Sequence, residues 1–244
     1  MRVTRSHIDH PLAVGQTLAL PEDAANHLVR VMRLREGDGC VLFNGDGQDY
    51  SATLVTVGKR DAQVRIEGAT TLDNESPLHI TLLQGIARGE KMDLILQKAT
   101  ELGVQAFVPV NAERTEVKLD AARAEKRLAH WHSVVVSACG QSGRARVPSV
   151  AAPQSLQDAA HGVAAGALKL TLDPQGEHRL STLSAAPDGV VIAIGPEGGW
   201  SPRDRQTLAG AGFQGLQLGP RVLRTETAGL AAIAAVQARL GDLG

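Results

Sequence analysis

Aromatic residues and cysteines are scarce in this sequence of 244 residues. Aromatics make up 2% of the chain, so alanine, leucine and valine must fill most of the core, and a base-stacking platform for single-stranded nucleic acid is disfavoured. The two cysteines, Cys40 and Cys139, have no metal-binding spacing with each other or with a histidine. This pattern argues against a zinc site and against a disulfide framework, so we expect no metal and a reducing compartment.

Long apolar runs and an excess of one charge are also missing. The apolar stretch TAGLAAIAAVQA near the C-terminus has about 12 residues, whereas a membrane span needs about 18 or more. No apolar signal segment follows the first arginines. The formal net charge is −1, so binding to nucleic acid would need a local basic patch. We therefore expect a cytoplasmic protein with no membrane partner.

What the sequence does contain is a change of pattern near residue 73. Before it, short alternating segments dominate, and GCVLFNGDGQDYSATLVTV reads as two strands around a tight turn. PEDAANHLVRVMR predicts one short helix. These features predict a small β-rich barrel or sandwich as a domain over residues 1–73, followed by the polar stretch TTLDNESP.

From residue 78 onward, apolar strands alternate with helices, which predicts a parallel sheet covered on both faces in a second domain, 74–244. The helix that starts near Gly89 places Met92, Ile95, Ala99 and Leu102 on one face, with Gly103 placed to end it. A later segment begins with the helix-start pattern SPRD.

Two similar junctions occur in this second half. IGPEGGWS at 194–201 and LGPRVLRTETA at 218–228 both follow an apolar strand with Gly-Pro and lead into a helix. Ligands of open α/β sheets bind beyond the carboxyl ends of the strands. The glycines would let the backbone approach a ligand closely, or would only form turns. Neither junction matches a phosphate-binding loop or a dinucleotide-binding fingerprint.

Several segments together resemble the RsmE family, methyltransferases of the SPOUT class that modify N3 of a uridine in small-subunit (16S) ribosomal RNA. The resemblance is carried by GEKMDLILQKATELGV, the two Gly-Pro junctions, GQSGRARVP, HLVRVMRLREGD and FNGDGQDY, and it spans nearly the whole chain. Two positions depart from the family pattern: Gly140 stands in place of an acidic residue, and Asp204 in place of glutamate.

The resemblance implies an α/β fold with a SPOUT-type parallel sheet and a C-terminal trefoil knot, preceded by a small PUA-like β-barrel that binds RNA. It also implies S-adenosylmethionine as cofactor, a homodimer, and ribosomal RNA within the assembled 30S subunit as partner. The cofactor would lie among the ends of three strands, against Leu172, Ile194, Gly195, Pro196, Glu197, Gly198, Leu218, Gly219, Leu223 and Thr225.

Methylation of uridine N3 requires loss of the N3 proton and stabilisation of negative charge on the neighbouring oxygens. Arg224 and Glu226, in the second junction, are the candidate catalytic residues, because an arginine is well suited to stabilise such an anion. The alternative is that these two residues form an ion pair that fixes the loop. For Glu197 we favour a role in orienting its loop over one as a general base.

Basic residues gather in two places that could hold RNA phosphates. Residues 1–35 carry five arginines against three acids, and arginine favours phosphate recognition over a merely solvated helix face. The alternative for both places is an ordinary solvated surface. The candidate RNA-binding residues are Arg2, Arg5, His27, Arg30, Arg33, Arg35, Arg144 and Arg146.

Two other classes of function remain open. A non-catalytic RNA-binding or ribosome-assembly factor would need the basic patch but no cofactor pocket. An α/β enzyme that acts on a small phosphorylated metabolite would leave the arginine-rich N-terminal region unexplained.

Overall fold

A computed structural model describes residues 4–58, 61–184 and 187–244. The chain forms two compact units. The N-terminal unit contains Met1–Glu75 and Val136–Val147, and the C-terminal unit contains Ser76–Val135 and Pro148–Gly244. The boundary expected after residue 73 lies close to the first division, but the short segment 136–147 also joins the N-terminal unit. The domain division of 1–73 and 74–244 itself stays a prediction.

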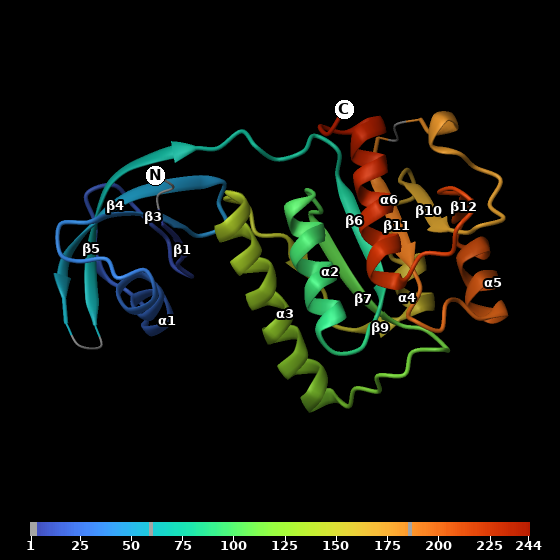
Figure 1. The fold of residues 1–244 in the computed structure, drawn as a ribbon, viewed down its shortest axis with the longest axis horizontal. Coiled ribbons are helices and arrows are strands. Elements are labelled where there is room, and N and C mark those ends of the chain that lie inside the picture. The colour runs from blue at the N-terminus through green and yellow to red at the C-terminus, as the bar shows by residue number, and fades with distance from the viewer. Residues whose placement is uncertain (1–3, 59–60, 185–186) are drawn as a thin grey trace. The chain divides into compact units, whose positions relative to one another are not determined.

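The N-terminal unit is built on one five-stranded sheet (Figure 1). Its strand order is β1 (Arg5–His7), β3 (Gly39–Phe43), β4 (Gln48–Val57), β5 (Ala62–Thr71) and β2 (Thr17–Ala19). Strands β3 and β4 pair antiparallel around the predicted tight turn, where Gly45 and Gly47 have φ of 92° and 93°. The hairpin is therefore confirmed, whereas closure of the sheet into a barrel stays a prediction.

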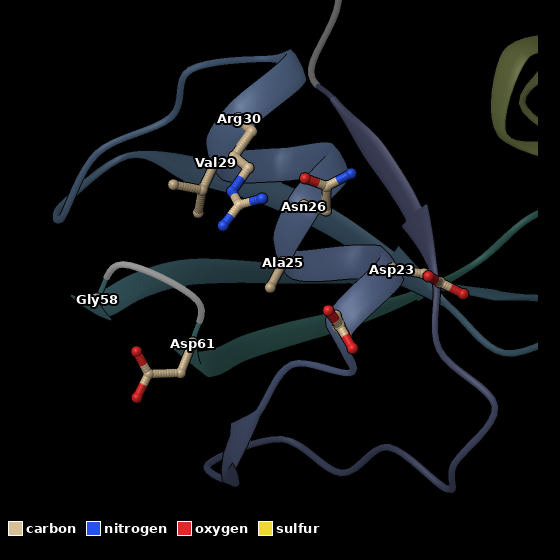
Figure 2. Close-up of a pocket in the computed structure, with 8 residues that line it drawn as sticks. Asp23, Ala25, Asn26, Val29, Arg30, Gly58 and Asp61 are labelled. Atoms are coloured by element: carbon tan, nitrogen blue, oxygen red, sulfur yellow. The ribbon is translucent and has the colours of Figure 1, made fainter.

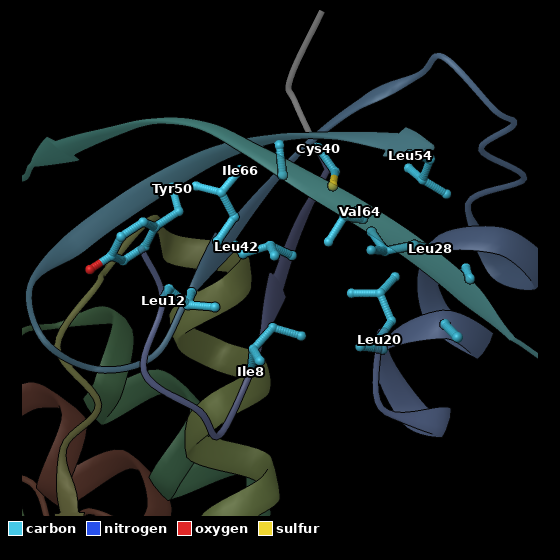
Figure 3. Close-up of a cluster of buried hydrophobic side chains, with 14 residues drawn as sticks. Ile8, Leu12, Leu20, Leu28, Cys40, Leu42, Tyr50, Leu54, Val64 and Ile66 are labelled. Atoms are coloured by element: carbon cyan, nitrogen blue, oxygen red, sulfur yellow. The ribbon is translucent and has the colours of Figure 1, made fainter. Parts of the chain in front are cut away.

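A helical segment covers this sheet where one short helix was expected. It begins as α1 (Glu22–Ala25) and continues as a π-helical turn, η1 (Asn26–Val31). Leu28 is fully buried in the core of the unit, which Figure 3 shows between the sheet and this segment. Arg33, just beyond, has a φ of 58°, a left-handed conformation that is strained for a residue with a side chain.

Two arginines fix the segment 136–147 within the N-terminal unit. Arg5 forms an ion pair with Asp49 and donates hydrogen bonds to the carbonyl oxygens of Cys139 (3.1 Å) and Arg144 (3.2 Å). The Arg144 guanidinium pairs in turn with Glu75, with its Nε 3.1 Å from both carboxylate oxygens. These bonds anchor the segment although Gly140 lacks the acidic side chain that the family pattern suggests.

The C-terminal unit contains a parallel sheet, as the sequence predicts, and this sheet has seven strands in the described residues. Its main strand order is β12-β10-β11-β6-β7-β8, and β9 also pairs with β7. The bounds are β6 Ile80–Gly85, β7 Ala106–Asn111, β8 Ser149–Val150, β9 Gln154–Ser155, β10 Leu168–Leu172, β11 Val190–Ile194 and β12 Gln214–Leu216.

Helices cover both faces of this sheet. Figure 1 shows α2 (Glu90–Glu101) beside α6 (Thr225–Leu240), and these helices contact each other while α6 also packs on β6 and β11. The other face carries α4 (Leu156–His161) and α5 (Pro202–Gly210), around a core that includes Leu83, Val191 and Trp200. The long helix α3 (Ala121–Ser142) begins in the C-terminal unit and ends in the N-terminal one.

The predicted helix ends are confirmed. Ser201 caps α5: its Oγ accepts from the Asp204 N–H at 3.1 Å, while the Asp204 carboxylate accepts from the Ser201 N–H at 3.0 Å. Aspartate therefore serves in place of the family's glutamate. Gly103 follows the last residues of α2 with a φ of 87°. None of the helices in the described residues is long and apolar enough to cross a membrane.

Candidate functional site: a cavity at the ends of three strands

Three neighbouring parallel strands end at one edge of the sheet and open into a cavity of about 560 Å³. Strand β10 ends at Leu172, β11 at Ile194 and β12 at Leu216, and all three residues line the cavity. Because β12, β10 and β11 are adjacent, the two Gly-Pro junctions that follow β11 and β12 meet at the same place. The two junctions therefore form the walls of a single cavity.

The cavity includes most of the residues expected to bind a cofactor. Nine of the ten line it: Leu172, Ile194, Gly195, Pro196, Glu197, Leu218, Gly219, Leu223 and Thr225. Gly198 does not, and its neighbour Gly199 takes its place. The Gly198 carbonyl accepts a hydrogen bond from Arg114 at 3.1 Å, and a Cβ on Gly198 would lie 3.0 Å from the Cβ of Arg114. Gly198 thus packs against the neighbouring loop.

A buried chain of hydrogen bonds joins the two junctions. Gln84, at the end of β6, donates from Nε2 to Thr225 Oγ1 at 3.1 Å, and Thr225 donates onward to the Gly195 carbonyl at 2.6 Å. Gln84 is fully buried and Thr225 nearly so. Next to Gln84, a Cβ on Gly85 would lie 2.5 Å from the nitrogen of Pro196, so only glycine fits there. The first loop is thus held in one position.

A second pair of bonds fixes the far end of the first loop. The indole N–H of Trp200 donates to Thr171 Oγ1 at 3.0 Å, and the Thr171 hydroxyl donates to the Ala193 carbonyl at 3.0 Å. These bonds tie the end of the first loop to β10 and β11. Beyond them, Arg205 pairs with Asp173 at 2.9 Å, and both residues line the cavity.

Charged side chains from α2 and both junctions cluster at the cavity. The Lys91 ammonium lies 3.4 Å from Glu197 and 3.8 Å from Glu226. Arg88 donates its backbone N–H to Glu197 at 3.0 Å, and its guanidinium pairs with Glu116 at 2.8 Å. The cluster thus brings two carboxylates to one lysine.

Glu197 accepts a hydrogen bond from the Arg88 N–H and lies beside Lys91, contacts that suit the loop-orienting role we favour for it. Burial alone would raise the pKa of its carboxyl. Hydrogen bonds from the Arg88 N–H and from its own backbone N–H, together with Lys91, outweigh burial and hold the pKa below its ordinary value. Glu197 is therefore a stabilised carboxylate.

The ion pair between Arg224 and Glu226, the alternative to a catalytic role, is not among the ion pairs of the described residues. Glu226 faces Lys91, while Arg224 is exposed at the start of α6. Arg224 lines the cavity together with Arg221 and Val222, and the Val222 side chain is 85% exposed. Two arginines are thus presented at the opening.

The sequence analysis missed several residues of the cavity. Arg88 lies just before α2 and Lys91 lies in its first turn, within a motif that served only as a family signature. Asp173 directly follows a predicted strand. A charged residue at the carboxyl end of a parallel strand was a usable signal. Gln84 and Trp200 gave no such signal, since their roles depend on which strands are neighbours.

The expected RNA-binding residues divide into two groups. His27, Arg30, Arg33, Arg35 and Arg146 are exposed. The expectation of RNA binding is corrected for Arg5 and Arg144. Their side chains are only 8% and 6% exposed and form the ion pairs that anchor the segment 136–147, so their role is structural. Arg2 lies outside the described residues.

One exposed basic residue, Arg30, lines a hollow of mixed charge. The hollow has a volume of about 180 Å³ and lies beside the helical segment (Figure 2). It is also lined by Glu22, Asp23 and Asp61, whose carboxylates would repel a phosphate. This hollow is therefore poorly suited to hold an RNA phosphate.

The fold agrees with comparisons to known proteins. Residues 74–237 match the family model of an RNA methyltransferase domain, and residues 20–67 match that of an RNA methyltransferase PUA domain. The chain therefore has the two parts of an RNA methyltransferase that carries a PUA domain.

Individual relatives identify the family within this class of RNA methyltransferases. Ribosomal RNA small subunit methyltransferase E of Bacillus subtilis is 33% identical, over 90% of this chain and 89% of the relative. The enzyme of the same name from Mycobacterium tuberculosis is also 33% identical, over 94% and 89%. A crystal structure of this methyltransferase from Neisseria gonorrhoeae, bound to S-adenosyl methionine, matches with a TM-score of 0.95, 42% identity and full coverage of both chains. The chain belongs to the ribosomal RNA small subunit methyltransferase E family.

Proposed function

We propose that this protein transfers a methyl group from S-adenosylmethionine to N3 of a uridine in small-subunit (16S) ribosomal RNA. The observation that carries the proposal is the cavity formed jointly by the two Gly-Pro junctions in a chain of this family. The relatives' shared name specifies small-subunit ribosomal RNA, and the N3 position rests on the family resemblance.

The cavity fits S-adenosylmethionine in size and chemistry. Its volume of about 560 Å³ lies in the range of small-molecule sites. Leucines from three segments offer an apolar wall for a flat adenine. Three carboxylates, those of Asp173, Glu197 and Glu226, favour a ligand that carries a positive sulfonium. S-adenosylmethionine, when bound, supplies the methyl group.

The chain's own residues would prepare the uridine. Arg221 and Arg224 stand at the opening of the cavity, where their positive charges can stabilise the uracil oxygens as negative charge develops on them. The rigid loops hold the reacting groups in line, which removes an entropic cost from the chemical step.

The exposed basic residues of the N-terminal unit would dock the RNA. His27, Arg30, Arg33 and Arg35 follow or lie in the helical segment, and Arg146 lies on the anchored segment 136–147. Such contacts go to phosphates and position the substrate without reading its sequence. The match of residues 20–67 to a PUA domain supports this role.

We extend the proposal to the C-terminal knot. Strand β12 lies at the edge of the sheet, yet the next element, α6, packs on the central strands β6 and β11. The chain therefore returns from the edge to the centre through the junction 218–225, a path that suits a trefoil knot, one of the rare exceptions to unknotted folds.

The proposal also includes assembly and context. The alanine-rich helix α6 suits close helix packing, and a two-fold homodimer is the commonest oligomer. The substrate would be the RNA within the assembled 30S subunit, which places the reaction in the cytoplasm. Sedimentation as a monomer at micromolar concentration with full activity would rule out the dimer.

The alternative classes make different predictions. A non-catalytic assembly factor would bind RNA without methylating it. An enzyme for a small phosphorylated metabolite would require a phosphate site, but the cavity carries three carboxylates beside its cations. We therefore rank the methyltransferase first.

Two matched variants test the assignment of the two basic regions. Arg30→Ala should weaken RNA binding and reduce its salt slope by about one unit, with little change in turnover at saturating substrate. Arg224→Ala should slow single-turnover methylation about a hundredfold or more and leave RNA affinity nearly unchanged. Nucleoside mass spectrometry of the labelled RNA identifies the product. Methyl label at any position other than N3 of uridine would overturn the proposed specificity, and a reversed pattern of the two variants would overturn the residue roles.

A further inference from the structure

The three carboxylates that line the cavity differ in how their charge is satisfied. Asp173 pairs with the Arg205 guanidinium at 2.9 Å. Glu197 accepts a hydrogen bond from the Arg88 N–H and lies 3.4 Å from Lys91. Glu226 is different: its Oε2 is buried, and no donor in the described residues hydrogen-bonds to it.

A buried oxygen without a donor is unusual, because such an atom has lost its water and gained no hydrogen bond in exchange. Lys91 is the cation facing Glu226, but at 3.8 Å it attracts the carboxylate without donating a hydrogen bond. Glu226 is thus the cavity carboxylate with an unused capacity to accept a proton or a hydrogen bond.

The proposed reaction needs such an acceptor. Uridine N3 carries a proton at neutral pH, and its electron pair becomes available only as that proton leaves. We propose that Glu226 is the general base that takes the N3 proton. Lys91 is the neighbouring cation that keeps the Glu226 carboxylate ionised before the proton arrives. This inference rests on the proposed function, and it names the residues that carry out one part of that reaction.

The step balances in atoms and charge. The N3–H bond breaks and its proton goes to the Glu226 carboxylate, while the N3 electron pair forms the new bond to the methyl carbon. The bond between that carbon and sulfur breaks, and its electron pair stays on sulfur. One positive charge on sulfur and one negative charge on Glu226 disappear together, so the net charge of the cavity is unchanged.

Lys91 has a defined part in this exchange. It lies between Glu197 and Glu226, and protonation of Glu226 leaves it paired with Glu197 alone. The positive charge of Lys91 is then offset by one carboxylate in place of two. Lys91 therefore stabilises the anionic character of the uracil as the proton moves, and is a positioning residue for Glu226 beforehand.

The test compares Glu226→Gln with Glu90→Gln in the full-length protein. Glutamine keeps the shape and removes the basicity, and Glu90 is an exposed acid on the same helix as Lys91 that does not line the cavity. We expect Glu226→Gln to slow single-turnover methylation of small subunits about a hundredfold or more at neutral pH, within the range of general-base catalysis. Glu90→Gln should match the wild type.

Three further measurements separate a base from a structural residue. The residual rate of Glu226→Gln should rise about tenfold per pH unit, because only uridine that has already lost its proton can react. Calorimetric affinity for S-adenosylmethionine should stay within about threefold of wild type. Lys91→Met should slow methylation when it is introduced into the wild-type protein. Added to Glu226→Gln, the same substitution should cause no further loss, since the two residues act together.

The outcomes decide between the alternatives. A wild-type rate in Glu226→Gln, or a rate with the wild-type pH profile, overturns the inference. So does a large loss of S-adenosylmethionine affinity, which would make Glu226 a cofactor ligand. Failure of the proposed function is a separate result, since the wild-type protein itself would then place no methyl group on uridine N3.

Discussion

Replacing Thr225 by valine tests whether the buried hydrogen-bond chain holds the cavity together. Valine has nearly the shape of threonine but lacks the hydroxyl, which accepts from Gln84 at 3.1 Å and donates to the Gly195 carbonyl at 2.6 Å. In the valine variant the Gln84 amide keeps its bond to the Gly85 carbonyl, but its second N–H loses its acceptor, and the Gly195 carbonyl loses its donor. Each buried group left unsatisfied costs about 1–3 kcal/mol, so we expect a loss of about 2–4 kcal/mol.

Thr225→Ser is the matched control. Serine retains both hydrogen bonds and loses one methyl group, at a cost of about 1 kcal/mol. Urea unfolding followed by tryptophan fluorescence suits the measurement, because Trp131 and Trp200 both belong to the C-terminal unit. A loss of about 3 kcal/mol should lower the urea midpoint by about 1–1.5 M.

The same pair of variants should separate in cofactor binding, since the chain fixes the Gly195 loop. Thr225→Val should bind S-adenosylmethionine at least about tenfold more weakly, equivalent to about 1.4 kcal/mol, and Thr225→Ser should stay near wild type. If valine proves as stable as serine, or if both bind the cofactor equally, the hydrogen-bond chain does not have the role described here.

Two other predictions concern the first Gly-Pro loop. Gly85→Ala should abolish S-adenosylmethionine binding in calorimetry because its Cβ would lie 2.5 Å from the Pro196 nitrogen. Gly229→Ala should bind normally, because its Cβ would lie 3.6 Å from Gln84 Oε1, an ordinary contact distance. The stability that Glu197 provides should be present at neutral pH and lost on acidification, because its folded-state pKa is lowered. In urea unfolding, the difference between wild type and Glu197→Gln should therefore shrink as the pH falls below about 4.5, and a difference that grows with acid would contradict this.

Strong local patterns allowed most of the C-terminal unit to be predicted. The face of α2 that carries Met92, Ile95 and Ala99 is buried, and the Ser201 cap forms as the SPRD pattern indicates. The short elements β8, β9 and α4 were missed because 148–161 has neither a clear alternation nor a long helical period.

The site was predictable where it depended on local sequence and unpredictable where it depended on strand order. The Gly-Pro junctions were visible as motifs, but Gln84 lies 141 residues from its partner Thr225. The sequence also does not distinguish a buried arginine from an exposed one. Arg5 is buried in an ion pair, whereas Arg30 is exposed.

The placement of the segment 136–147 in the N-terminal unit affects how the chain is made. Translation finishes Glu75 well before it reaches Val147, the last residue of that unit, and 72 residues separate the two. At about 5–20 residues per second, this interval lasts about 4–14 s. During that time Arg5 has no backbone carbonyls of Cys139 and Arg144 to bind, and Phe43 lacks Cys139 and Ala145 as core neighbours. The N-terminal unit, although synthesised first, therefore cannot complete its core until the end of α3 and the residues after it have been translated.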